Sequence, residues 1–566
     1  GPGNTLTTAV DNIFIGSRTG TAYTSGCNII AIGINAGASS CCAAVGCNNI
    51  HIGQNTGCKV QSGDNNVTIG CRAGRNLTTG RCNIFMGLYA GGTASTGGDN
   101  VAIGNRAGAQ FGATFNGLIA IGCCAGGGYG GGPHGGIFIG RCAGRYVNDP
   151  NSGDNIAIGS QAGKCMTCGS NVIIGSGAMT NATAALGNIG LGGQVLQQNL
   201  TGNKNVAIGQ FALAGNTSGC CNIGLGPNAG PGVTGATGNH NFFGAYKSGR
   251  SITTGFDNTI IGRCAGYEIT SGSCNVFMGV CAGAGVTSGI NNIMMGLSAG
   301  GSGAGIGTEN TFIGTCTGLC NTDGSCNVFI GQQAGKLNTT GCYNVAIGDR
   351  AGCCLKTCTT NVLIGLAAGM KLCGGSSNIF IGNQTGLCAT TSGENVVMGT
   401  VAGKALSSGV NNVAIGKMSG CKLYAGSHNV LLGNCSGYCL QGLNNVMLGM
   451  NAGFHRSGNQ YCRNVLIGKS AGDNATTLAV DNYDVLIGYL AGRDYTGSCS
   501  IGIGHSVNLP INDGMNQLAI GQYDDNWIVG DCNYNVGIGT TKPIAKLDVN
   551  VGSSVSAFNI EGSEGQ

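Results

Sequence analysis

The chain has 566 residues, of which 112 are Gly and 7 are Pro, and its formal net charge is +4. Because Gly does not recur at every third position and Pro is scarce, a collagen-like triple helix is excluded. Charged residues make up 8% and hydrophobic residues 42% of the chain, which argues against charge-rich disorder. The 26 Lys and Arg residues are too few to build the basic face of a nucleic-acid-binding protein. The sequence also lacks an apolar run long enough to span a membrane.

A nine-residue unit, Asn-Val-x-Ile-Gly-x-x-Ala-Gly, recurs along almost the whole chain. Asn66 to Gly74 is one copy and Asn412 to Gly420 is another. The first Gly of the unit occurs in 31 copies between Gly16 and Gly539, about 17 residues apart. Regular self-similarity with so short a period predicts stacked rungs of a solenoid, rather than several globular domains.

The residues before the first Gly of each unit predict a short strand. Positions three and one before this Gly are almost always apolar, and the position between them is often apolar as well. A strand of this kind is expected to be covered on both faces. An apolar residue also returns about seven positions after the Gly, as at Val60, Leu77 and Leu355. We expect this residue to mark a second, weaker strand, so that each rung holds two strands and two turns.

The fold class that follows is all-β: a parallel β-solenoid, or β-roll, of about 31 rungs with a 17-residue repeat. No amphipathic segment is available to cover the second apolar face of the strands. Burial against two copies of the same chain around a threefold axis, as a homotrimeric fibre, is the simplest expectation.

Four segments are expected along the chain. Residues 1–3, Gly-Pro-Gly, are typical of the scar left by removal of a purification tag, so we expect a recombinant fragment of a longer protein. Residues 4–505 form the solenoid shaft. Residues 506–534 break the pattern and hold the only Trp, Trp527, beside Asp524 and Asp525. We expect this region to cap the stack, with a receptor site at the tip as the alternative. Residues 535–566 form a C-terminal neck.

Asn stands four residues before the first Gly in 24 of the 31 copies. Asn side chains stacked from rung to rung can donate and accept hydrogen bonds along the solenoid, which satisfies buried amides. We therefore predict a structural Asn ladder rather than a ligand site. Its most regular run is Asn310, Asn327, Asn344, Asn361, Asn378, Asn395, Asn412 and Asn429.

The 32 cysteines gather at the predicted corners of the rungs. Equivalent positions on adjacent rungs should have Cα atoms about 4.8 Å apart, inside the range that a disulfide spans. The candidate rung-to-rung pairs are Cys264 with Cys281, Cys124 with Cys142, Cys326 with Cys342, and Cys421 with Cys439. The candidate pairs within one corner are Cys316 with Cys320, and Cys435 with Cys439.

Two other interpretations of the cysteines remain open. They could stay free and pack as small hydrophobic residues, or bind metal. The one Cys-x-x-Cys motif, Cys165 to Cys168, has no second pair and no nearby His, which is weak evidence for zinc. We expect no metal and no cofactor.

Catalytic motifs are absent from the sequence. It contains no P-loop, no Gly-x-Ser-x-Gly and no His-Glu-x-x-His. The six His residues are far apart and do not follow the repeat. We therefore name no catalytic residue and do not expect an enzyme; a glycan-cleaving groove between chains is a minor alternative.

Two resemblances to known families rest on these motifs. The Asn-Val-x-Ile-Gly-x-x-Ala-Gly unit resembles the head repeats of trimeric autotransporter adhesins, which form left-handed parallel β-rolls. The segment from Asn535 to Val549, with Gly537-Ile538-Gly539-Thr540-Thr541-Lys542-Pro543, is similar to the segment that precedes the intramolecular chaperone of phage tail fibres and tailspikes. Related arrangements occur in fibre proteins of large DNA viruses. In that family the chaperone assembles the trimer and is often removed by self-cleavage. None follows here, so we expect it to have been cut off or left out of the fragment.

The function expected from these features is mechanical. The first hypothesis is a rigid, disulfide-reinforced trimeric shaft on a virion surface, extracellular, for host attachment or particle protection. The alternative is a cellular adhesin or extracellular filament at the cell surface. The chain itself is the main expected partner, and a host-surface glycan or receptor is the second; neither nucleic acid nor membrane insertion is expected.

Overall fold

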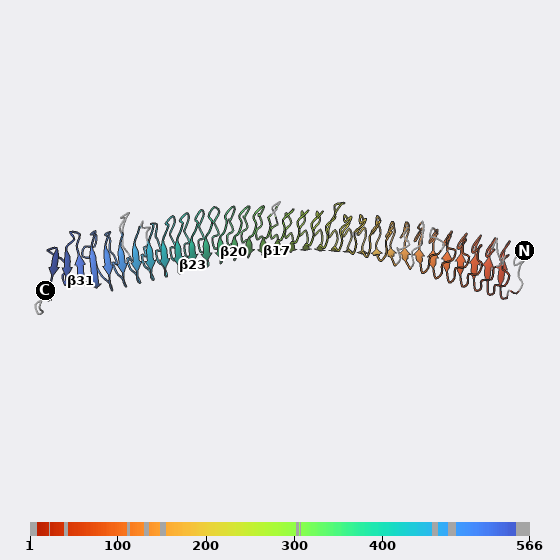
Figure 1. Cartoon of the computed structure of the whole chain (residues 1–566), viewed down its shortest axis with the longest axis horizontal. Helices are drawn as coiled ribbons and strands as arrows, with labels where there is room; N and C mark the ends of the chain where they lie inside the picture. Colours follow the sequence, from red (N-terminus) through yellow and green to blue (C-terminus); the bar gives the residue numbers. More distant parts are fainter. Residues whose placement is uncertain are drawn as a thin grey trace, which may run out of the picture. The chain divides into compact units, whose positions relative to one another are not determined.

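The computed structural model describes residues 8, 10–21, 23–38, 44–109, 114–128, 135–147, 154–301, 305, 307–455, 462–473 and 483–550. The tag scar at residues 1–3 lies outside them, as does the end of the neck. The chain divides into two compact units, Gly1–Asn291 and Asn292–Gln566. In both, short strands follow one another along a solenoid (Figure 1). The described residues contain strands, turns and bends but no helix.

Among its described residues the first unit holds sixteen three-residue strands, and consecutive strands from β1 to β16 pair in parallel and in register. They are β1 (Ile13–Ile15), β2 (Ile30–Ile32), β3 (Ile50–Ile52), β4 (Val67–Ile69), β5 (Ile84–Met86), β6 (Val101–Ile103), β7 (Ile119–Ile121), β8 (Ile137–Ile139), β9 (Ile156–Ile158), β10 (Val172–Ile174), β11 (Ile189–Leu191), β12 (Val206–Ile208), β13 (Ile223–Leu225), β14 (Phe242–Gly244), β15 (Thr259–Ile261) and β16 (Val276–Met278).

The second unit continues the same pattern from β17 to β30. Its strands are β17 (Ile293–Met295), β18 (Thr311–Ile313), β19 (Val328–Ile330), β20 (Val345–Ile347), β21 (Val362–Ile364), β22 (Ile379–Ile381), β23 (Val396–Met398), β24 (Val413–Ile415), β25 (Val430–Leu432), β26 (Val446–Leu448), β27 (Val465–Ile467), β28 (Val485–Ile487), β29 (Ile501–Ile503), β30 (Leu518–Gln522), β31 (Asp525–Gly530), β32 (Val536–Ile538) and β33 (Leu547–Val549). The prediction of an all-β parallel solenoid is thus confirmed.

The middle residue of each three-residue strand from β2 to β29 is buried inside the rung. In β19 and β20, for example, Phe329 and Ala346 are fully buried, while the residues on either side of them are half-buried. The small residue before the second Gly of the unit also lies inside, as does the apolar residue near the seventh position. Each rung therefore encloses a narrow core of a few side chains.

The predicted second strand is wrong. Val60 and Leu77 are buried as expected, but their backbone N–H groups bond three residues back, to the carbonyls of Gly57 and Gly74. These N–H groups are used in turns inside the rung, so they cannot join a ladder between rungs. Among the described residues outside the named strands, only isolated parallel bridges occur, such as Tyr23 with Ala44.

The first Gly of the unit forms a corner that a side chain would block. At Gly348 the φ angle is +132°, and an added Cβ would lie 2.4 Å from the carbonyl oxygen of Gly365 on the next rung. Gly accepts this close stacking with positive φ without steric cost, and Ala245 is an exception that occupies the same corner with φ of 107°. The recurrence of Gly at nearly every rung therefore follows from the geometry of the stack.

Parallel stacking ends after β30. This strand pairs antiparallel with β31, which pairs antiparallel with β32, and β32 pairs in parallel with β33. The motif copy whose first Gly is Gly539 thus lies outside the parallel stack. A hairpin of this kind covers the open edge of the last rung with backbone hydrogen bonds.

Candidate functional surfaces

The Asn ladder runs through the interior corner of most rungs. Asn361 Nδ2 donates to Asn344 Oδ1 at 3.1 Å, and Asn378 Nδ2 donates to Asn361 Oδ1 at 3.1 Å. The backbone N–H of Asn378 donates to the same oxygen, and Asn361 Nδ2 also donates to the Gly375 carbonyl. The side-chain bonds span the whole predicted run, at 2.9–3.1 Å: Asn310, Asn327, Asn344, Asn361, Asn378, Asn395, Asn412 and Asn429.

Two shorter ladders escaped the sequence analysis. Asn216 Nδ2 donates to Asn199 Oδ1 at 2.9 Å, and Asn338 Nδ2 donates to Asn321 Oδ1 at 2.6 Å. Each holds only two Asn residues, and the Oδ1 atoms of Asn216 and Asn338 are buried without a hydrogen-bond partner. The sequence feature that could have revealed these ladders is Asn at the seventh position after the first Gly, where most rungs carry an apolar residue.

The main ladder changes composition near the end of the second unit. Asp484, Ser500 and Gln517 occupy the position that Asn holds elsewhere, and all three are buried. Asp484 Oδ1 accepts from the backbone N–H of Ser500 at 3.0 Å. Burial disfavours the carboxylate and raises the pKa of Asp484 to about 7, with the Ser500 hydrogen bond opposing the shift.

A polar cluster interrupts the interior of the first unit. His51, the middle residue of β3, is fully buried; its Nδ1 lies 2.6 Å from Thr68 Oγ1 and its Nε2 lies 3.3 Å from the Tyr23 hydroxyl. Burial lowers the pKa of His51 to about 4 and raises the pKa of Tyr23 above its usual range. This cluster is closed to solvent, so it affects stability rather than binding.

The strands leave one apolar face on the outside of each unit. We call it the apolar face: the first and third residues of the strands, which point away from the core and are mostly Val and Ile. In β20 and β21 both such residues are half-buried, and Ile415 of β24 is 39% exposed. Ile313 and Ile208 are similarly exposed, at 36% and 41%. Because the face repeats with every rung, it forms two apolar columns along each unit.

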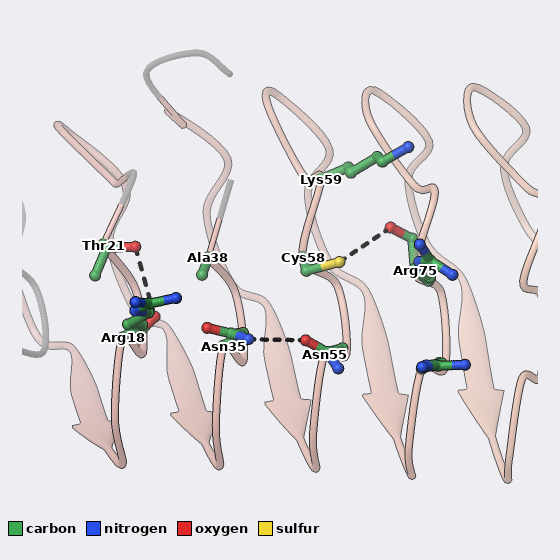
Figure 2. Close-up of a pocket in the computed structure, with 9 residues that line it drawn as sticks. Arg18, Thr21, Asn35, Ala38, Asn55, Cys58, Lys59 and Arg75 are labelled. Atoms are coloured by element: carbon green, nitrogen blue, oxygen red, sulfur yellow. Dashed lines mark hydrogen bonds between the residues drawn. The ribbon is translucent and has the colours of Figure 1, made fainter. Parts of the chain in front are cut away.

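A basic hollow lies on the first unit, away from the strands (Figure 2). Two columns of side chains frame it. Arg18, Asn35, Asn55 and Arg72 stand two residues after the first Gly, and Thr21, Ala38, Cys58 and Arg75 stand five after it; Lys59 completes the lining. The hollow measures about 440 Å³, and no Asp or Glu lines it.

Backbone geometry fixes the first of these columns. Arg18, Asn35, Asn55 and Arg72 all have left-handed backbone angles, with φ of 54–60°. Backbone hydrogen bonds of 2.8–3.0 Å join the corners of Asn35, Asn55 and Arg72 to the rung before each of them. Asn35 Nδ2 donates to Asn55 Oδ1 at 2.9 Å. The sequence analysis missed the hollow because no single rung contains it. The feature that could have indicated it is Arg at both the second and the fifth position after the first Gly of one rung.

The predicted disulfides are not formed among the described residues. All thirty cysteines among the described residues are free. Cys264 with Cys281 and Cys124 with Cys142 do lie in register on adjacent rungs. Equivalent side chains on parallel rungs stay parallel, however, so their Cβ atoms keep the rung spacing of about 4.8 Å, beyond the usual Cβ separation of a disulfide, about 3.8 Å. The prediction compared only Cα distances.

The other candidate pairs are out of register or confined to one corner. Cys342 lies beside Ser325, whose N–H donates to its Sγ, so it is offset by one residue from Cys326. The Lys422 N–H donates to the Tyr438 carbonyl, which sets Cys439 beside Lys422 rather than Cys421. The corner cysteines Cys316, Cys320 and Cys435 are half-buried thiols.

One close cysteine pair was not predicted. Cys27 Sγ and Cys47 Sγ lie 2.8 Å apart on the rungs of β2 and β3, and both are free. The 20-residue spacing between them departs from the repeat, which is why the sequence pattern did not pair them.

The C-terminal end carries an exposed aromatic side chain. Trp527 of β31 is 63% exposed and lines a hollow with Asp524, Asp525 and Thr540. Asp524 Oδ1 accepts from Asn508 Nδ2 at 2.8 Å. The strand to which Trp527 belongs pairs antiparallel with both β30 and β32.

In the described part of the chain, no three His, Cys, Asp or Glu side chains gather closely enough to hold a metal ion. Nor does any described segment form a helix of the length and apolarity needed to cross a membrane.

In comparisons with known proteins, no protein-family model matches this chain, and no curated protein sequence matches it.

Proposed function

We propose that the chain is a structural fibre protein: a stiff homotrimeric shaft displayed outside a virion, which serves in attachment or protection and has no catalytic role. The observation that carries this proposal is the apolar face, which repeats on every rung of both units. The resemblance of Asn535–Val549 to the neck of tail-fibre proteins supports the viral setting.

The partner proposed for the apolar face is a further copy of the same chain. Its two columns repeat at the rung spacing of about 4.8 Å, and only a surface with the same axial repeat matches them along their length. Two such side chains on each of the fourteen strands β17–β30 offer on the order of 1,500 Å², comparable to a stable protein interface. Each rung contributes one strand, so each chain has one apolar face. Three chains around a threefold axis can bury their three apolar faces against one another.

The test combines mass with substitution of the apolar face. Light scattering after size exclusion should give about three times the chain mass of 56.1 kDa. The triple variant Ile347→Glu, Ile364→Glu and Ile381→Glu should retain its β circular dichroism and fall to the mass of one chain, because buried carboxylates lack partners in the trimer. These side chains are half-exposed in the single chain, which therefore tolerates them.

A matched control places the same three charges one residue after the first Gly. Gln332→Glu, Asn383→Glu and Thr400→Glu lie at exposed corners and should leave the trimer intact. A monomeric or dimeric parent chain would refute the threefold shaft. Immunogold labelling then tests the setting: label on virus particles supports the viral fibre, and label on a cell surface supports a cellular adhesin or filament instead.

A further inference from the structure

The basic hollow has the properties of an anion-binding site. Arg18, Lys59 and Arg75 are exposed, and none of them forms an ion pair with a described residue. Figure 2 shows Lys59 and Arg75 on the same side of the rungs, with Arg18 at the far end of the hollow. The small side chain of Ala38 stands where the neighbouring rungs carry Thr21 and Cys58, which keeps the middle open.

The hollow is long rather than deep. From Arg18 to Arg72 it crosses three rung intervals, about 14 Å at the usual strand spacing. A single sulfate or phosphate ion would contact one end only. A chain with negative groups along its length would contact the cations at both ends and the amides of Asn35 and Asn55 between them.

We infer that this hollow binds a linear polysaccharide that carries carboxylate or sulfate groups. Guanidinium and ammonium groups make charge-assisted hydrogen bonds to both anions, and the Asn amides and the Thr21 hydroxyl suit the sugar hydroxyls between them. No aromatic side chain lines the hollow, so it lacks the stacking platform that single-stranded nucleic acid uses. The inference gives the attachment role of the proposed function a ligand class, and it rests on that function for the exposed location.

The experiment measures binding of fluorescein-labelled heparin, which carries sulfate and carboxylate groups, and of labelled alginate, which carries carboxylates alone. Fluorescence anisotropy is followed at two salt concentrations. The variant Lys59→Glu with Arg75→Glu should weaken binding at least about tenfold, because two charge-assisted contacts become repulsive. A milder variant, Lys59→Gln with Arg75→Gln, should weaken it in the same direction and serves if the first does not fold.

The control variant is Arg106→Glu with Lys204→Glu. Both residues are exposed, have left-handed backbone angles, belong to the first unit and lie outside the hollow. Each double variant changes the formal charge equally, so the control should alter the affinity less than about twofold if the site is local. Equal losses in the two variants, or no binding by the parent chain, would overturn the inference.

Two further arms separate the alternatives. Equal affinity for poly-glutamate or for single-stranded DNA would overturn the polysaccharide assignment in favour of general polyanion attraction. Light scattering on the same samples keeps the two proposals distinct. A monomer that binds heparin through Lys59 and Arg75 supports the site and refutes the trimeric shaft, whereas a trimer that does not bind refutes the site alone.

Discussion

Between Asn310 and Asn429 every rung of the second unit carries the same buried amide, whereas Asn464, Asp484, Ser500 and Gln517 follow one another at that position nearer the end. In the first region each Asn satisfies its neighbour by simple translation along the stack. In the second region each backbone N–H still donates to the side chain of the rung before it, but the remaining hydrogen bonds of these side chains differ from rung to rung. Ser500 receives a hydrogen bond from the Tyr495 hydroxyl, and Gln517 bonds the backbone of Ile511.

This contrast shows what the repetition achieves. One polar side chain, identical in every rung, satisfies buried donors and acceptors for as many rungs as the sequence repeats it. When the identity is lost, local corner residues must compensate, and parallel stacking gives way to the hairpin of β31 and β32 within a few rungs.

The largest effect is expected from breaking the regular ladder. Asn361→Ala removes the acceptor of the Asn378 backbone N–H and the side-chain donor to the Gly375 carbonyl, and unsatisfied buried groups cost about 1–3 kcal/mol each, so roughly 3–5 kcal/mol of local stability should be lost. Hydrogen exchange of the amides in β21 and β22 measures the change. Asn383→Ala, at an exposed corner of the next rung, should change stability by less than about 0.5 kcal/mol. Similar exchange in the two variants would contradict a stabilising ladder.

The second effect concerns pH in the first unit. Burial lowers the pKa of His51 from 6.5 to about 4, so the unfolded chain binds a proton between these values that the folded chain does not. Stability should therefore be complete above pH 6.5 and fall by roughly 3 kcal/mol as the pH drops toward 4. Hydrogen exchange of β3 and β4, corrected for the intrinsic pH effect, measures it.

Variants at two histidines separate this effect from general acid sensitivity. His51→Phe should remove the pH dependence of β3 and β4, whereas His240→Gln should retain it, because the His240 side chain is 63% exposed. If the His51→Phe chain lost stability over the same pH range by the same amount, burial of His51 would not be the cause.

The smallest effect is expected from repairing the irregular region. The pKa of Asp484 is raised from 3.8 to about 7 by burial, so the folded chain binds a proton in this window and stability falls as the pH rises through it. Asp484→Asn removes that loss and offers Nδ2 to Asn464 Oδ1. We expect a gain of roughly 1–3 kcal/mol at pH 8 that shrinks at pH 5, measured by urea unfolding. Asp323→Asn, at an exposed turn, should give no gain; an equal gain at both pH values would argue against the titration.

Much of the fold could be predicted because the repeat encodes it rung by rung. The strands before each first Gly, the Asn ladder and the Gly corners follow from side chains whose partners are the same residues one rung away. The repeat alone could not decide whether the second apolar position of each rung lies in a strand or in a turn. Buried Leu77 has the same pattern in a strand and in a turn, and only the hydrogen bond of its N–H to Gly74 separates the two.

The sites were less predictable, since they depend on how irregular rungs stack. The pairing of Cys27 with Cys47 crosses a 20-residue interval, and the basic hollow combines residues from four rungs with different spacings. The disulfide prediction was wrong because parallel stacking sets the direction of the Cβ atoms, which the spacing of residues does not reveal.

The sequence by itself determined that this chain forms a parallel β-solenoid, because period, Gly corners and buried Asn are local properties that every rung repeats. The tertiary structure alone decided which side chains face outward together: the apolar face over the strands and the basic hollow across four corners. The physical reason is that a surface is a property of neighbouring rungs in register, and register is settled only when the backbone ladders and the interior side chains are packed together.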